Sequence, residues 1–213
     1  MRASVKRRAT ARASGERGYH HGDLRRALLE QAERTLRERG VEALSLRELA
    51  REVGVSHGAP RRHFADRQAL LDALAEAGFA RLGEALRRAL ARAGEDFEAR
   101  LRATAVAYVR FATRDSALLE LMFAGKRRAG AGALREAADR AFAVMVELIL
   151  QGQASGAIEA GDPERVGLVL FATVQGIAAL VGAGMVRERQ VGQLVGDAVA
   201  RFVHGPQALR RGG

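Results

Sequence analysis

The sequence contains no cysteine among its 213 residues. The chain can therefore form no disulfide, no thiolate zinc site and no cysteine nucleophile, which suits a reducing compartment. Its N-terminus, MRASVKRRATARASGERG, is basic but lacks the apolar run of about 7 to 15 residues that a secretory signal requires. We therefore expect a cytoplasmic protein.

Alternation of polar and apolar residues with period two, typical of a half-buried strand, is also missing, and no internal repeat of solenoid length is visible. Apolar residues recur instead at helical spacing, as in Leu24, Leu28, Ala32 and Leu36 before Gly40. Similar patterns follow in the ranges 66–94, 97–111, 118–123, 134–150, 163–186 and 189–204. The sequence therefore predicts an all-α fold of about nine helices.

Helix-start signals support several of these boundaries. Ser45 and Glu48 fit a capping box, in which the Ser45 hydroxyl accepts from the Glu48 amide and the Glu48 side chain returns a bond. Asp66 is placed to cap a long helix. Asp162, Pro163 and Glu164 combine a cap, a proline at the first helical position and an acid in the first turn. The Gly- and Arg-rich range 125–132 is typical of a loop.

Positive charge is concentrated at the front of the chain. Residues 1–67 hold 16 Lys and Arg against nine Asp and Glu, whereas the other 146 residues hold 19 against 16. Such an excess favours a nucleic-acid partner. We expect a disordered basic arm over 1–18, a three-helix DNA-binding domain over 19–66, a larger ligand-binding and dimerisation domain over 67–204, and a flexible tail over 205–213.

The segment LSLRELAREVGVSHGAPRRHF meets the requirements of a helix-turn-helix between about Ser45 and Phe64. Ala50 is the small residue that lets two helices cross, and Gly54 tolerates the positive φ of the turn. Apolar residues on both sides of the turn grip the core: Leu49, Val53, Val55 and Phe64.

Ser56 is placed to cap the second helix of this motif, which we expect to run from His57 to about His63. The missing amide of Pro60 falls in the first turn, where its loss costs little. This second helix is the one that enters the major groove of duplex DNA in such motifs.

From about Tyr19 to Leu74, the stretch YHHGDLRRALLEQAERTLRERGVEALSLRELAREVGVSHGAPRRHFADRQALLDAL resembles the DNA-binding domain of TetR-type regulators. Beyond it, AVAYVRFATRDSALLELMF and DPERVGLVLFATVQGIAAL resemble the regulatory domain of the same family. The resemblance implies a homodimeric bacterial repressor that pairs through its last two helices, binds a palindromic operator and responds to a small-molecule inducer. It implies no cofactor and no enzymatic activity.

Two positions depart from the pattern of that family. Arg61 stands where the family usually has Tyr, which replaces a stacking and hydroxyl contact with a strong phosphate binder. Gln175 stands where the closest subfamily has a His before Gly176, often with a Trp nearby, and this chain has no tryptophan. The family pattern therefore indicates DNA binding more directly than it indicates the identity of the ligand.

The first turns of a recognition helix face base edges, and small residues there permit close approach. On this basis we assign Ser56, His57, Gly58, Ala59, Arg61 and Arg62 to the recognition surface. Phosphate contacts are assigned to Arg47, His63 and Arg67. Alternatively, Arg61 and Arg62 are ordinary solvated surface residues. Tyr19 and His20 precede the first helix and either pack against the protein or hydrogen-bond to the DNA backbone.

Candidate effector-binding residues are the large apolar or singly polar side chains of the regulatory helices. They are Tyr108, Phe111, Met122, Phe142, Met145, Phe171 and Gln175. Side chains of these types also form ordinary helical cores, and that alternative stays open.

A rival function comes from Gly54-Val55-Ser56-His57-Gly58, which matches the G-x-S-x-G nucleophile elbow of serine hydrolases. An elbow requires a strand before its serine, whereas a capped helical pattern precedes Ser56. The hydrolase is therefore the weaker hypothesis.

Three further patterns have plainer explanations. Residues 166–186 carry no charge and pass the length test for a membrane span, but four glycines and several alanines equally allow close packing at a dimer interface, so no membrane partner is expected. His20 and His21 near Asp23 cannot easily share one ion, and no metal site is expected. Gly130-Ala131-Gly132 lacks the third glycine and the strand of a nucleotide-binding fingerprint.

Overall fold

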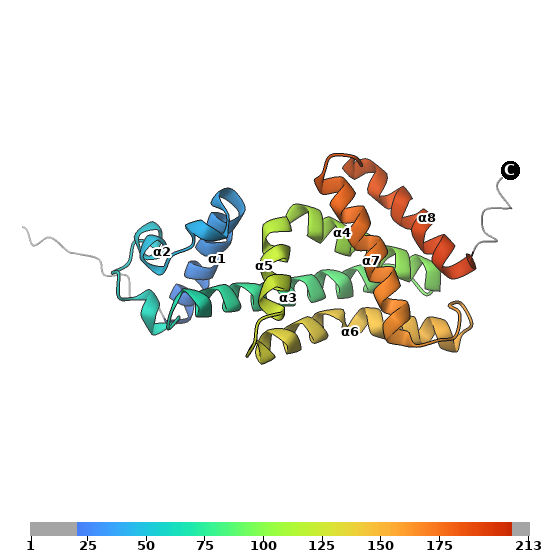
Figure 1. Cartoon of the computed structure of the whole chain (residues 1–213), viewed down its shortest axis with the longest axis horizontal. Coiled ribbons are helices and arrows are strands. Elements are labelled where there is room, and N and C mark those ends of the chain that lie inside the picture. The colour runs from blue at the N-terminus through green and yellow to red at the C-terminus, as the bar shows by residue number, and fades with distance from the viewer. Residues whose placement is uncertain (1–20, 206–213) are drawn as a thin grey trace, which may run out of the picture.

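The computed structural model describes residues 21–205, with side chains from Leu24 onward. This part of the chain is all helical and contains no strand (Figure 1). The predicted basic arm over 1–18, Tyr19, His20 and most of the predicted tail lie outside the described residues. The α-helices are α1 (His21–Arg39), α2 (Leu46–Val53), α3 (Arg67–Ala91), α4 (Phe97–Arg114), α5 (Ser116–Lys126), α6 (Gly132–Ala154), α7 (Pro163–Gly182) and α8 (Val191–His204).

Three short 3-10 helices complete the described chain: η1 (Val41–Ala43), η2 (Pro60–Arg62) and η3 (Glu188–Gln190). The all-α prediction is therefore confirmed, with eight α-helices in this range where about nine helices were predicted. The difference lies at η2, because the predicted helix from His57 to His63 is a short 3-10 turn instead.

α1, α2 and η2 form a small unit at one end of the molecule (Figure 1). Apolar side chains on the inner faces of these elements are at most 2% exposed, and they are Leu28, Leu36, Leu44, Leu49 and Phe64. The helical spacing read from the sequence therefore marks the buried face of α1 correctly.

α3 joins this unit to the rest of the molecule. Its 25 residues span about 37 Å at 1.5 Å per residue. Asp66 caps the helix by accepting from the Ala69 amide at 2.8 Å, as predicted. α3 packs against α4, α5 and α6. At Gly83 an added Cβ would lie 3.0 Å from the Ala141 backbone, so glycine lets α3 and α6 cross closely.

α4 packs against α7 and α8, and α7 also packs against α6, whereas α8 lies on the side of the molecule opposite α6 in Figure 1. Asp162 caps α7 through the Glu164 amide at 3.1 Å, and Pro163 occupies the first turn, as predicted. The helix ends at Gly182 rather than near Val186. The reason is that the Met185 and Val186 amides both turn back to the Leu180 carbonyl, at 3.0 and 3.2 Å.

The start of α2 confirms half of the predicted capping box. The Ser45 hydroxyl accepts from the Glu48 amide at 3.1 Å. The Glu48 carboxylate pairs with Arg51 and lies 3.8 Å from Arg39, and this arginine pairing takes the place of the predicted return bond to Ser45.

The predicted domain boundary at residue 66 coincides with the cap of α3. Because α3 contacts α1 as well as α4, α5 and α6, it belongs to both proposed domains. The division into 19–66 and 67–204 stays a prediction.

Candidate functional site

The turn after α2 has the geometry that a helix-turn-helix needs. Ala50 is fully buried where the helices cross, as expected for the small crossing residue. Gly54 ends α2 in the left-handed region, with φ 79° and ψ 33°, a conformation that side chains with a Cβ rarely adopt. The Val55 amide then donates to the Ala50 carbonyl at 2.9 Å, which closes the helix end.

The recognition segment, residues 56–63, is wound more tightly than the predicted α-helix. Its first bond runs from the Ala59 amide to the Ser56 carbonyl at 3.0 Å, and η2 begins at Pro60 without a side-chain cap. Pro60 has no N–H, so the α-helical bond from residue 60 to residue 56 cannot form. Ser56 therefore contributes its carbonyl, rather than the predicted hydroxyl cap, to the start of the segment.

The exposed face of this segment holds most of the predicted base-reading residues. Pro60 and Phe64 are buried and anchor it to the core, with Phe64 only 2% exposed. Ala59 and His63 are half-buried, and Arg47 is exposed on the neighbouring α2. The remaining predicted residues are exposed: Ser56, His57, Gly58, Arg61 and Arg62. The structure thus brings the predicted set onto one small unit, and contact with DNA stays a prediction.

Arg67, the last predicted phosphate contact, is partly occupied within the protein. Its Nε donates to the Leu44 carbonyl at 2.8 Å and a terminal nitrogen donates to the Val41 carbonyl at 2.6 Å. The guanidinium also lies 3.6 Å from the Glu42 carboxylate. Arg67 therefore fastens η1 to the start of α3, and its phosphate contact stays a prediction.

Glu52 on α2 holds the helix-turn-helix against α1. Its carboxylate accepts hydrogen bonds from Gln31 at 2.9 Å, Thr35 at 3.3 Å and Arg39 at 2.5 Å, all on α1. At the other end of the unit, the Arg25 guanidinium lies over the Phe64 ring, 5.4 Å from its centroid. These directional contacts fix the orientation of the recognition segment.

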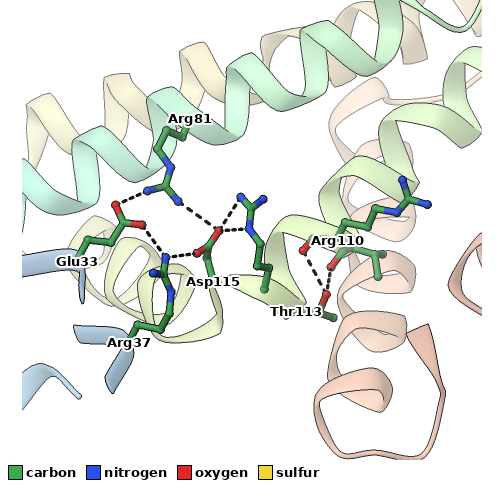
Figure 2. Close-up of polar contacts among 8 residues, drawn as sticks. Glu33, Arg37, Arg81, Arg110, Thr113 and Asp115 are labelled. Atoms are coloured by element: carbon green, nitrogen blue, oxygen red, sulfur yellow. Dashed lines mark hydrogen bonds and ion pairs between the residues drawn. The ribbon is translucent and has the colours of Figure 1, made fainter. Parts of the chain in front are cut away.

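Asp115 lies at the junction of α4 and α5 and gathers three arginines, as Figure 2 shows. Its side chain is only 1% exposed. The carboxylate accepts from Arg37 of α1 at 2.9 Å, from Arg81 of α3 at 3.2 Å and from Arg114 of α4 at 2.9 Å. Glu33 of α1 completes this polar hub by pairing with both Arg37 and Arg81. The hub joins α1, α3 and the junction of α4 and α5.

The contacts of the hub shift the pKa of Asp115 and of Arg37. Burial raises the pKa of Asp115, but hydrogen bonds from Arg37 and Arg114 and the nearby positive charges outweigh burial, so the pKa lies below its usual value. The hydrogen bond to Asp115 likewise raises the pKa of Arg37. Asp115 and Arg37 therefore both carry their charges near neutral pH. Sequence reasoning missed it, because an aspartate between Arg114 and Ser116 has no pattern that distinguishes it from a surface charge.

A groove of about 410 Å³ lies between α4, α6 and α7 and is mostly apolar. That volume falls within the range of small-molecule sites. Four aromatic rings contribute to its wall, with neighbouring centroids 5.4 to 6.4 Å apart, and they are Tyr108, Phe123, Phe142 and Phe171. Of the predicted effector residues, Tyr108, Phe142, Met145 and Phe171 line this groove.

The other predicted effector residues lie elsewhere. Phe111 and Met122 are 3% and 0% exposed in the core, and the Phe111 ring packs under the Arg81 guanidinium at 5.8 Å. Gln175 is half-buried behind the groove wall, where its Oε1 accepts from the Tyr108 hydroxyl at 2.7 Å. Burial raises the pKa of Tyr108, so its phenol stays neutral.

Sequence reasoning missed the charged residues at the groove, which are Lys126, Asp139 and Glu164. It also missed Phe123, although the apolar range 118–123 was recognised as a helical segment. Only the packing of α5 against α6 brings the end of that segment to the groove.

The outer face of α7 is apolar and uncovered in the single chain. Leu168 and Val169 are 66% and 55% exposed, and small residues continue the same face. Among the described residues, α7 alone is long and apolar enough to cross a membrane by length and composition, but the small residues suit a helix interface equally well. The exposed apolar residues of this face are Leu168, Val169, Ala172, Gly176, Ala179 and Leu180, and the exposed Thr173 donates its hydroxyl to the Val169 carbonyl at 2.9 Å.

Two family models match the chain. Residues 28–74 match bacterial regulatory proteins of the tetR family, and residues 101–204 match the tetracyclin repressor-like C-terminal domain. The two matches together cover the helix-turn-helix, the hub residues Arg37 and Asp115, and most of the groove. No curated protein matches the sequence significantly.

Solved structures show the same architecture. A protein of unknown function from Rhodococcus sp. RHA1 is 49% identical, with a TM-score of 0.82, and the match covers 89% of this chain and 98% of that one. A putative TetR-family transcriptional regulator from Rhodococcus sp. shares the fold at 22% identity, with a TM-score of 0.64 over 85% of this chain and 99% of that one. A putative transcriptional regulator from Pseudomonas aeruginosa PAO1 also shares the fold at 21% identity, with a TM-score of 0.70, and the match covers 87% of this chain and 92% of that one. The chain therefore belongs to the TetR family of bacterial regulatory proteins, and it has the DNA-binding fold of a transcriptional regulator.

Proposed function

We propose that this protein is a dimeric, cytoplasmic transcriptional repressor that a small-molecule effector releases from a palindromic operator. The observation that carries the proposal is the recognition segment, whose exposed residues include Arg61 and Arg62 while Pro60 and Phe64 anchor it. Exposed arginines on an anchored turn are suited to bases and phosphates. The positive excess in residues 1–67 supports the same partner.

The uncovered apolar face of α7 supports dimerisation through α7 and α8. Exposed Leu168 and Val169 beside the small residues Ala172 and Gly176 allow close approach of a second copy. A dimer presents two recognition segments, and both enter successive major grooves only when they lie about 34 to 36 Å apart. Dimer geometry therefore sets DNA affinity.

The proposed switch changes that spacing. α3 contacts α1 at one end and α6 further along, and α6 forms a wall of the groove. An effector that occupies the groove shifts α3 and, through it, the recognition segment. The resulting loss of DNA affinity cannot exceed the ratio of the effector's affinities for the DNA-bound and the released arrangement of the protein.

The rival hydrolase fits the local geometry less well. Ser56 follows the helix α2 and the Gly54 turn, whereas a nucleophile elbow places its serine after a strand. We therefore propose a non-enzymatic function. Turnover of a simple ester that disappears in Ser56→Ala would favour the hydrolase instead.

Footprinting on the promoter region beside the gene of this protein tests the proposal. We expect a protected palindrome whose occupancy falls steeply with salt, because each phosphate contact contributes a slope of about −0.9 in log affinity against log salt concentration. The double variant Arg61→Ala/Arg62→Ala should lose the protection.

The control removes two neighbouring arginines elsewhere. Arg87→Ala/Arg88→Ala has the same charge loss on α3, where both side chains lie near Glu84 at 3.4 and 2.7 Å. This variant should protect the palindrome like the original protein. Equal loss in both double variants would show that net charge, rather than the recognition segment, governs binding.

A further inference from the structure

The groove between α4, α6 and α7 carries charges that indicate the class of its ligand. Lys126, Asp139 and Glu164 are its charged lining residues, which gives the groove a formal charge of about −1 at neutral pH. The Lys126 Nζ lies 4.0 Å from the Asp139 carboxylate, so the one cation is already near an acid. Within the described chain, no ion pair engages Glu164.

The aromatic wall, like the negative charge, favours a cationic ligand. Neighbouring rings among Tyr108, Phe123, Phe142 and Phe171 have centroids 5.4 to 6.4 Å apart at the groove. A positive charge near the face of an aromatic ring is attracted by the ring quadrupole, whereas a carboxylate or phosphate gains nothing there.

Besides Lys126, the polar groups that could donate to an anion at the groove are already used or absent. The Tyr108 hydroxyl donates to Gln175 at 2.7 Å. The first turn of α7 reaches the groove with Pro163, which has no N–H, and Glu164, whose amide donates to Asp162 at 3.1 Å. An anion entering this apolar space would find, apart from Lys126, few donors to replace its hydrogen bonds to water, which is costly.

We infer that the groove binds an apolar, ring-containing organic cation, such as an aromatic amine, in preference to a carboxylate or phosphate of the same size. This inference rests on the proposed function for the role of the groove as effector site, and it adds the class of the effector. The ammonium group lies nearest Asp139 or Glu164, and the rings of the ligand lie against the aromatic wall.

Three probes with one biphenyl core test the inference on the full chain at pH 7: 4-phenylbenzylamine, biphenyl-4-methanol and biphenyl-4-carboxylate. Calorimetric titration should give the tightest Kd for the amine and the weakest for the carboxylate. Asp139→Asn and Glu164→Gln should each weaken the amine by up to about fivefold, the size of an exposed ion pair, and leave the alcohol unchanged.

Glu136→Gln is the matched control. Glu136 lies on α6 like Asp139, and both side chains are 75% exposed. Glu136 pairs with Arg140 at 3.8 Å and does not line the groove. It should change none of the three affinities. Absence of amine binding, a carboxylate that binds as tightly as the amine, or equal losses in Glu136→Gln would overturn the inference.

A parallel gel-shift measurement with operator DNA separates the two proposals. Amine binding that leaves the protein on DNA would contradict effector release while supporting the ligand class. Release of DNA by the carboxylate in preference to the amine would contradict the ligand class while supporting effector release.

Discussion

The recognition unit and the aromatic groove are held together by different kinds of contact. Around the recognition segment, directional bonds dominate: Glu52 accepts three hydrogen bonds from α1, and Arg67 donates to two backbone carbonyls. Around the groove, the aromatic rings meet at centroid distances of 5.4 to 6.4 Å beside open space. Such ring contacts constrain direction far less than charged hydrogen bonds do.

The difference matches what each region has to do. A surface that reads DNA needs one fixed arrangement of side chains, because small misplacements lose base contacts. A groove that admits a ligand needs side chains that can adjust around it. The polar hub at Asp115 lies between the two regions and joins the fixed one to α4, which carries Tyr108 of the groove wall.

Truncating one ring in the core and one at the groove gives the largest expected contrast in stability. Phe79 is fully buried and packs edge-on against Phe123 at 6.0 Å. Phe79→Ala should lower the free energy of unfolding by about 4 kcal/mol, and Phe171→Ala by only about 1–2 kcal/mol, because the Phe171 ring already borders open space. Urea unfolding at constant m-value measures both, and equal losses would contradict the comparison.

Removing the carboxylate of the hub should have the next largest effect. Asp115→Ala leaves Arg37 and Arg81 facing a buried space without their acceptor. Because both guanidiniums are partly exposed to water, we expect a loss of about 2–3 kcal/mol in the free energy of unfolding rather than the full cost of an isolated buried charge. Urea unfolding measures the loss.

The control for this variant is an exposed carboxylate with a similar arginine environment. Glu84 pairs with Arg87 and Arg88 at the surface of α3. Glu84→Ala should leave the unfolding midpoint nearly unchanged, because exposed pairs contribute little. A loss as large as that of Asp115→Ala would show that the burial of the hub is irrelevant.

The pH dependence of stability should isolate the hub further. The pKa of Asp115 is lower in the folded chain than in the unfolded one, so its ion pairs stabilise the fold above the ordinary carboxyl pKa of about 3.9. This contribution is lost as pH falls from about 4 through the lower folded pKa. The difference in the free energy of unfolding between the original protein and Asp115→Asn should therefore shrink as pH falls below about 4. A difference that stays constant down to low pH would contradict the lowered pKa of Asp115.

Much of the fold could be predicted, because the start and the buried face of a helix depend on residues that are close together in the sequence. The caps at Asp66 and Asp162 and the apolar face of α1 depend on neighbouring residues and were read correctly. The errors in the predicted capping box and recognition helix arose where two local interactions compete and the sequence alone does not show which is stronger. Arg51 and Arg39 draw the Glu48 carboxylate away from Ser45, and Pro60 shortens the recognition helix to a 3-10 turn.

The candidate sites were predictable only in part. Residues adjacent in sequence, such as those from Ser56 to Arg62, necessarily lie together, so the recognition segment could be assigned as a unit. The groove combines residues from distant helices, and residue type alone does not separate Phe171, which borders it, from Phe111, which is buried in the core. Nor does any local pattern show that Asp115 meets Arg37, 78 residues away.

The smallest expected effect comes from the hydrogen bond at 2.7 Å that the Tyr108 hydroxyl, in the groove wall, donates to Gln175 behind it. Tyr108→Phe should cost about 1 kcal/mol, because the ring packing remains and only one neutral bond is lost. Gln175→Leu removes the other partner, and the double variant should cost little more than either single change if the two side chains act as a pair. Urea unfolding of the four proteins gives this coupling. Additive losses would show that Tyr108 stabilises the groove through its ring alone, and the contrast with the bonded recognition unit would then be sharper.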